Sequence, residues 1–279
     1  MTYDLIGKAV ALTGGSQGIG RCVALTLASE GARLALMARS AKGLAATSLE
    51  VEKLGGSAVP IACDVTDDTS VRTAIDRAAR DLDGIDVFLN IAGITLQKTL
   101  LEANPEDFQR VMDTNLLGVV RCTRSVVPHL KESRGVLVNV ASIIVNNPFP
   151  QMGVYACSKW ALAAFSHTLR QELHGTGIRI LTVYPTVVRT EMLKAEPVLA
   201  RTPSQSPEAC ARAIVRAIKK GRREADTAWL PKISGILFKL HPPWGDRLNR
   251  LFIPNGYVFF HILRTHASSG TGNNYWFTY

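Results

Sequence analysis

The chain has 279 residues, of which 47% are hydrophobic and 20% are charged, a balance typical of a soluble globular protein. Five scattered cysteines without a C-x-x-C pair indicate neither a disulfide framework nor a zinc site, so we expect a reducing, cytoplasmic location and no metal. We expect no signal peptide and no membrane span, because no apolar run is long enough, and no nucleic-acid partner, because no recognition module is visible.

The net charge of +9 is concentrated in the last quarter of the chain. Residues 1–200 hold 20 basic and 19 acidic side chains, whereas residues 201–279 hold 12 and 4. A partner that responds to positive charge would therefore meet the C-terminal quarter.

The first element is an apolar run over residues 8–13, which predicts a strand, followed by a glycine-rich turn and a helical pattern over 21–30. This unit is typical of pyrophosphate binding, because glycines permit a tight turn and close backbone approach while the helix N-terminus supplies free N–H groups. The spacing is G-x-x-x-G-x-G. We expect these residues to contact a dinucleotide: Gly14, Ser16, Gln17, Gly18, Ile19 and Gly20.

A second strand is predicted over residues 33–38, and it ends at Arg39 and Ser40. An acidic residue at this position binds the free 2′-hydroxyl of an adenosine ribose, whereas an arginine accommodates a 2′-phosphate. Arg39 without a neighbouring acid therefore predicts NADP(H) as the cofactor. The alternative is a solvated surface arginine.

Helices over 42–54 and 67–82 alternate with strands over 58–62 and 86–90. This alternation predicts an α/β fold with a doubly wound parallel sheet, which binds ligands at the carboxyl ends of its strands. Residues that follow such ends are expected in the cofactor site, although Asp and Asn also terminate strands for purely local reasons. They are Asp64, Val65, Asn90, Ala92 and Gly93.

One long helix is predicted over 106–130, with Asn115 near its middle. Asparagine is unfavourable inside a helix, so Asn115 either faces water or has a specific task.

A strand over 136–140 leads to Ser142, and a further helix is predicted from Tyr155 to His174. Tyr155 and Lys159 are four residues apart and so share one helix face. A neighbouring ammonium favours the phenolate and should lower the pKa of Tyr155 towards neutrality, which makes Tyr155 a candidate acid or base. Ser142 could then hydrogen-bond a substrate oxygen. The alternative is a partly buried phenol beside a solvated amine.

A strand over 179–184 precedes Pro185, Val188 and Thr190, which are placed to touch cofactor or substrate. We expect a substrate lid at about 186–206, a helix over 207–220 and an edge strand at 228–230, giving one domain over residues 1–228. The extension, 229–279, holds 11 of the 19 aromatic side chains. It packs on protein or makes a peripheral membrane contact, and both interpretations stay open.

Taken in this order, the motifs resemble those of short-chain dehydrogenases/reductases with a single Rossmann domain, over about residues 5–230. The resemblance rests on the turn from Thr13 to Gly20, on Asp64, on the Asn-x-Ala-Gly of residues 90–93 and on four residues that match the family's active site. These four are Asn115, Ser142, Tyr155 and Lys159.

The resemblance implies hydride transfer between a nicotinamide and a carbonyl carbon. Ser142 would polarise the carbonyl and Tyr155 would supply the proton. Lys159 would lower the pKa of Tyr155 and hold the nicotinamide ribose, and Asn115 would hold a water. A homodimer or homotetramer is also implied. The chain departs from the family at Ile91, where a second Asn is frequent, and at Thr186, where Gly is usual.

Three functions follow as hypotheses. The first is an NADPH-dependent oxidoreductase that interconverts a ketone and a secondary alcohol on an apolar, steroid-like, retinoid-like or lipid substrate. The second is a 3-oxoacyl reductase whose basic C-terminal quarter meets an acidic carrier protein or the phosphates of CoA. The third is a non-catalytic nucleotide-sensing scaffold, because a fold does not fix a function.

Overall fold

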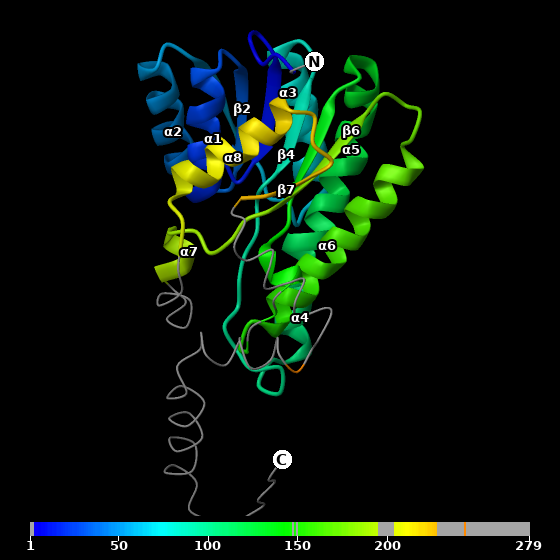
Figure 1. Cartoon of the computed structure of the whole chain (residues 1–279). Coiled ribbons are helices and arrows are strands. Elements are labelled where there is room, and N and C mark those ends of the chain that lie inside the picture. Colours follow the sequence, from blue (N-terminus) through cyan, green and yellow to red (C-terminus); the bar gives the residue numbers. More distant parts are fainter. Residues whose placement is uncertain (1–2, 147, 149, 195–203, 228–242, 244–279) are drawn as a thin grey trace, which may run out of the picture.

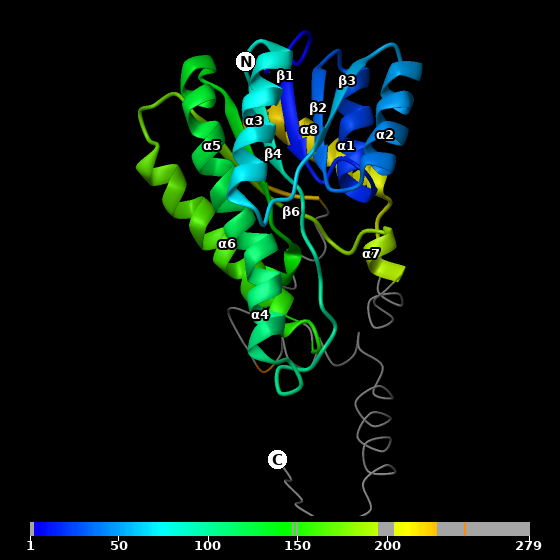
Figure 2. The same ribbon diagram turned by 180° about the vertical axis from the view of Figure 1, so that it is seen from behind.

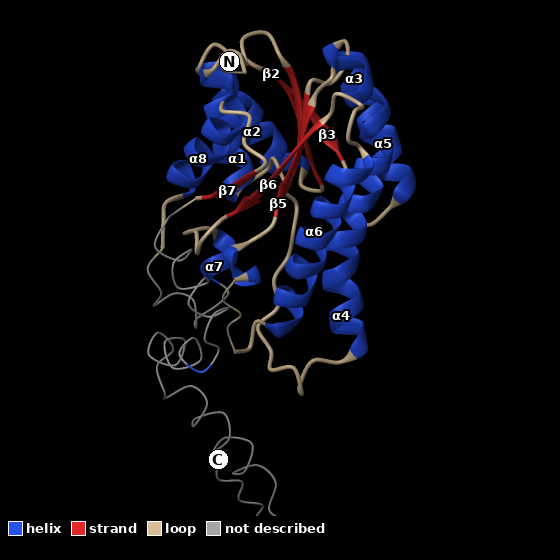
Figure 3. Cartoon of the chain, turned by 45° about the vertical axis from the view of Figure 1, so that its right-hand side comes forward, coloured by secondary structure: helices blue, strands red, loops and turns tan. Residues whose placement is uncertain are grey.

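The computed structural model describes residues 3–146, 148, 150–194, 204–227 and 243. Within these residues a seven-stranded parallel sheet has the strand order β3-β2-β1-β4-β5-β6-β7. Figure 3 shows the strands of this sheet in red between the blue helices. The strands are β1 (Ala9–Thr13), β2 (Arg33–Ala38), β3 (Ser57–Ala62), β4 (Val87–Asn90), β5 (Val136–Val140), β6 (Arg179–Tyr184) and β7 (Glu224–Asp226).

Helices cover both faces of this sheet. Figure 1 shows one layer formed by α1 (Gly18–Ser29), α2 (Ala41–Lys53) and α8 (Pro207–Lys219). Figure 2 shows the opposite layer, with α3 (Asp68–Leu82), α5 (Gly118–Ser133) and α6 (Gly153–Glu172). Beyond the carboxyl ends of the strands lie α4 (Pro105–Met112) and the short α7 (Glu191–Lys194). The doubly wound parallel fold predicted from the sequence is therefore confirmed.

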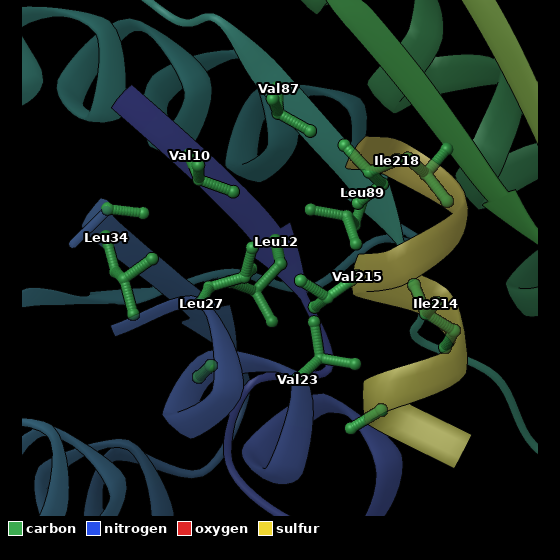
Figure 4. Close-up of a cluster of buried hydrophobic side chains, with 14 of the residues drawn as sticks. Val10, Leu12, Val23, Leu27, Leu34, Val87, Leu89, Ile214, Val215 and Ile218 are labelled. Carbon is green, nitrogen blue, oxygen red and sulfur yellow. The ribbon is translucent and has the colours of Figure 1, made fainter. Parts of the chain in front are cut away.

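The central strand β1 is buried on both faces, which explains its uninterrupted apolar sequence. Val10 and Leu12 pack into the cluster beneath α1 and α8, whereas Ala9 and Ala11 face the cluster on the other side. Figure 4 shows the first cluster, in which side chains of α1 and α8 close over the strands; the labelled examples are Val23, Leu27, Ile214, Val215 and Ile218.

The prediction of one long helix over 106–130 is wrong in one respect, because the helix is interrupted. A π-helical turn, Asp113–Leu117, separates α4 from α5 and contains Asn115. Such π-turns widen the backbone and are frequent at functional sites. The side chain of Asn115, which is fully buried, bonds to groups outside its own helix, and these contacts account for the departure from α geometry.

One further element boundary differs from expectation. Helix α6 begins at Gly153, two residues before Tyr155, and a β-carbon at Gly153 would lie 2.4 Å from Cδ2 of Leu100. The exposed Leu100 side chain therefore lies against the start of α6, and a side chain at residue 153 would displace it. The edge strand is Glu224–Asp226, while the expected edge strand at 228–230 and the C-terminal extension lie outside the described residues.

Candidate active site

The glycine-rich turn between β1 and α1 has the shape of a pyrophosphate cradle. Gly14 adopts a φ of +73°, which disfavours any residue with a side chain, and a β-carbon on Gly20 would lie 2.1 Å from the carbonyl oxygen of Gly14. The side chain of Gln17 does not cap α1, so the first N–H groups of that helix stay available to a ligand. These residues fit a nicotinamide dinucleotide.

A cavity of about 340 Å³ extends from this turn along the carboxyl ends of the strands. Most of the residues expected to bind the cofactor line it. They are Gly14, Ser16, Gln17, Gly18, Ile19, Gly20, Arg39, Ser40, Asp64, Val65, Ala92, Gly93 and Thr190. The cavity is therefore the candidate cofactor cleft.

The floor of the cofactor cleft is held by Thr13, to which sequence reasoning gave no separate role. Its buried hydroxyl accepts hydrogen bonds from the N–H groups of Ile91 (3.1 Å) and Ala92 (3.2 Å). It also lies 3.4 Å from the carbonyl oxygen of Leu89. These hydrogen bonds hold the end of β1 against the end of β4, and the cofactor cleft lies over both strand ends.

Charges at the adenosine end of the cleft come from Arg39 and Asp64. Arg39 is exposed at the end of β2, and Ser40 caps α2 by accepting a hydrogen bond of 3.1 Å from Gly43 N. The pKa of Asp64 is lowered, chiefly by the hydrogen bond from the Thr66 backbone, with the positive charge of Arg39 contributing. An anionic group brought to Arg39 would therefore meet an exposed cation near the Asp64 carboxylate.

A second cavity, of about 130 Å³, brings together Ser142, Tyr155 and Lys159. It shares several lining residues with the cofactor cleft, so the two are continuous; these are Ile19, Ile91, Gly93, Thr190 and Met192. Its remaining wall is mostly apolar and includes Ile143, Ile144, Met152, Val187 and Val188, with Thr95, Pro185 and Thr186 beside them. We call this cavity the candidate substrate pocket.

Lys159 is the buried cation of this pocket. Its side chain donates a hydrogen bond of 2.9 Å to the carbonyl oxygen of Val140, and only 4% of the residue is exposed. Burial lowers the pKa of Lys159 to about 8, because removing an ammonium from water disfavours its charged form.

The expected lowering of the Tyr155 pKa is not found. Burial raises the pKa of Tyr155 to about 12, and a hydrogen bond with Ser142 offsets only part of this rise. The Lys159 ammonium lies 5.7 Å from the centre of the Tyr155 ring and is bonded to Val140. Loss of water around the phenol therefore outweighs the neighbouring cation.

Asn115 lines neither cavity but links two elements that do. Its amide nitrogen donates to the carbonyl oxygen of Ile94 (2.9 Å) and to the hydroxyl of Ser158 (3.0 Å), and its oxygen accepts from Ile94 N at 2.8 Å. Both amide hydrogens are thus used. The side chain connects the segment after β4 to the helix that carries Tyr155 and Lys159.

Of the remaining residues expected in the site, some line the substrate pocket and others lie outside both cavities. Pro185 and Val188 line the substrate pocket, whereas Asn90 is buried and donates to Asn139 at 2.9 Å, away from either cavity. Thr186 stands where the family usually has a glycine. Its backbone is not in the left-handed region, and its N–H donates to the Thr227 hydroxyl at 3.2 Å. The extra β-carbon is therefore accommodated.

The segment at residues 97–98 contacts the turn at residue 151, next to the substrate pocket, and no sequence pattern indicated this contact. The N–H of Lys98 donates to the carbonyl oxygen of Gln151 at 2.9 Å, and the amides of Gln97 and Gln151 bond at 2.8 Å. Gln151 has a φ of +65°, unusual for a residue with a side chain. This turn sets Met152 into the pocket wall.

No helix in the described part of the chain is long and apolar enough to cross a membrane.

Comparison with known proteins identifies the class. A family model described as short chain dehydrogenase matches residues 8–198. A fatty acyl-CoA reductase of Acinetobacter baylyi is 31% identical over 257 residues, covering 91% of this chain and 85% of that protein. Ketoacyl reductase HetN of Nostoc is 35% identical over 261 residues, covering 89% and 90%.

A solved short chain dehydrogenase/reductase from Burkholderia phymatum, in complex with NAD, has the same fold. Its TM-score is 0.80 at 24% identity, covering 87% of this chain and 96% of that one. The protein therefore belongs to the short-chain dehydrogenase family of nicotinamide-dependent oxidoreductases.

The buried lysine predicts a pH-dependent stability difference between the wild-type protein and Lys159→Met. The folded pKa of about 8 lies below the ordinary 10.5, so between these values the unfolded chain holds a proton that the folded chain has released. Wild-type stability, relative to the variant, should thus rise by about 2 kcal/mol between about pH 7.5 and about pH 10.

Urea unfolding at both pH values measures this difference, with Lys53→Met, at an exposed position of α2, as the matched control. If the stability of the wild type relative to Lys159→Met falls as the pH rises, the pKa of Lys159 is not lowered in the folded protein.

Proposed function

We propose that this protein is an NADP(H)-dependent oxidoreductase that interconverts a ketone and a secondary alcohol on an apolar substrate. The observation that carries the proposal is the substrate pocket, where Ser142, Tyr155 and Lys159 meet an apolar wall next to the cofactor cleft. The family supports the reaction type, and Arg39 supports the choice of cofactor.

The residues of the pocket divide the work of carbonyl reduction. When bound, the nicotinamide supplies the hydride. The Ser142 hydroxyl holds the carbonyl oxygen, on which negative charge grows as the carbon is reduced. The raised pKa of Tyr155 keeps its hydroxyl protonated at neutral pH, and the oxygen of a nascent alkoxide is basic enough to take that proton.

Lys159 supports this transfer from behind the phenol. Its ammonium lies on the Tyr155 ring side and stabilises the phenolate that proton donation leaves. Gly93 packs closely against the Asn115 amide, since a β-carbon there would lie 3.1 Å from Asn115 Oδ1. A polar substrate group elsewhere in the pocket would face Ile143, Ile144 and Val187, so the wall favours an apolar ketone.

A 3-oxoacyl thioester is the second candidate substrate. Relatives with this kind of name include the ketoacyl reductase of Nostoc and a 3-oxoacyl-[acyl-carrier-protein] reductase of Bos taurus, which is 35% identical over 188 residues. An acyl chain also suits the apolar wall. Turnover of bulky apolar ketones favours the first proposal, and turnover limited to 3-oxoacyl thioesters favours the second.

We also propose a homodimer or homotetramer with an interface on the helical segments that contain Asn115 and Tyr155. Leu117 after Asn115 and Trp160 beside Lys159 are 46% and 50% exposed. Aromatic side chains such as Trp160 are enriched at the interfaces between proteins. Light scattering of the full chain should give an oligomer, and Trp160→Lys should shift it towards monomer. A monomer in the wild type would remove the proposal.

Replacing Tyr155 with Phe removes the proton donor and keeps the ring. We expect turnover to fall by at least about a thousandfold while the Kd for NADPH changes by less than about threefold. Tyr184→Phe is the matched control, because Tyr184 is also partly buried but bonds Glu224 outside both cavities. Activity of Tyr155→Phe within tenfold of wild type would show that another group supplies the proton.

Replacing Arg39 with Ala tests the cofactor. We expect NADPH to bind about tenfold to a hundredfold more weakly, the value of a charge-assisted hydrogen bond, while NADH binding stays nearly constant. Arg33→Ala, at the opposite end of the same strand, is the control. Equal losses for both nucleotides would mean that Arg39 does not meet a 2′-phosphate.

Binding of either nucleotide without turnover of any carbonyl would leave the scaffold function as the interpretation.

A further inference from the structure

A chain of buried polar side chains crosses the core behind the substrate pocket. Asn90 of β4 donates to Asn139 of β5 at 2.9 Å, and Asn139 donates to the hydroxyl of Ser166 in α6, also at 2.9 Å. Ser166 completes the chain by donating to the carbonyl oxygen of Leu162 at 2.8 Å. Asn139 and Ser166 are fully buried, and Asn90 is 3% exposed.

This chain joins the same two elements that carry the catalytic side chains. Ser142 follows β5, and Tyr155 and Lys159 belong to α6. Seven residues, two helical turns, separate Lys159 from Ser166, so both lie on the helix face turned to β5. Helix α6 is therefore bonded to β5 at two points, from Lys159 to Val140 and from Asn139 to Ser166.

Apolar packing alone would fix the position of α6 on β5 only weakly. Contacts between aliphatic side chains have no direction, and a helix can shift along a strand at small cost if volumes still match. A buried hydrogen bond, in contrast, is lost when its partners move apart, and each partner left unpaired is destabilised. Two such bonds about 10 Å apart along the helix fix both its height and its rotation.

We propose that the Asn139–Ser166 hydrogen bond is a positioning contact that sets α6 on β5 and thereby places Tyr155 beside Ser142. Neither residue lines the substrate pocket or the cofactor cleft, so neither touches substrate or cofactor. Their effect on turnover passes through the position of α6. The proposal rests on the function proposed above for Tyr155, and its test includes a measurement that does not need turnover.

Ser166→Ala removes the acceptor of Asn139 and leaves the helix otherwise intact. We expect kcat to fall by about tenfold to a hundredfold, as displacement of a catalytic group by about 1 Å does, with the Kd for NADPH unchanged within about twofold. Ser166→Thr, which keeps a hydroxyl at this position, should recover most of the rate.

Ser48→Ala is the matched control for loss of a buried serine. Ser48 of α2 donates to the carbonyl oxygen of Ala58 in β3 at 2.8 Å, a similar helix-to-strand bond remote from Tyr155. It should lower stability to a similar degree and leave kcat near wild type. An equal fall of kcat in Ser48→Ala would reduce the Ser166 effect to general destabilisation and overturn the proposal.

Hydrogen exchange of the backbone amides supplies the measurement that is independent of activity. Peptides covering residues 153–166 should exchange faster in Ser166→Ala than in the wild type, and those peptides should be unaffected in Ser48→Ala. Unchanged exchange in α6, or faster exchange with an unchanged kcat, overturns the positioning role. If Tyr155→Phe stays active, the proposed function fails. The hydrogen-exchange result would still show whether the Asn139–Ser166 hydrogen bond holds α6 in place.

Discussion

The hydrogen bond from the buried Lys159 ammonium to the carbonyl oxygen of Val140 is the interaction on which the candidate active site depends. An ammonium removed from water is unfavourable unless it is bonded, and this bond ties the first turns of α6 to the end of β5. Ser142, Tyr155 and Lys159 therefore all derive from one strand–helix junction. The proposed chemistry is local to that junction, although the cleft beside it is assembled from most of the sheet.

The cofactor cleft is defined mainly by backbone. Gly14 and Gly20 bring β1 and α1 so close that no side chain fits between them, and the Thr13 hydroxyl holds the end of β4 against the same turn. A cleft made in this way changes shape little when a ligand arrives, because its walls are the ends of a buried sheet. In the function proposed here, selectivity among nucleotides then falls to the few side chains at its rim, with Arg39 foremost.

The sheet and the motif residues could be predicted because they have local signals: apolar runs, glycine spacing, and a tyrosine four residues before a lysine. The π-turn at Asn115 could not, since it depends on Ile94 and Ser158, which are distant in sequence. The pKa of Tyr155 was predicted in the wrong direction, because the loss of water around its hydroxyl depends on the folded chain and not on the spacing to Lys159.

The strand order also governs how the chain can fold as it is synthesised. On one side Val10 of β1 pairs with Leu34, but on the other it pairs with Val87, which is 77 residues further along. Strands β1, β2 and β3 can thus form a sheet early, while the open edge of β1 waits for β4. An unpaired apolar edge is a template for association with other chains, so the nascent protein is open to such association until β4 pairs with β1.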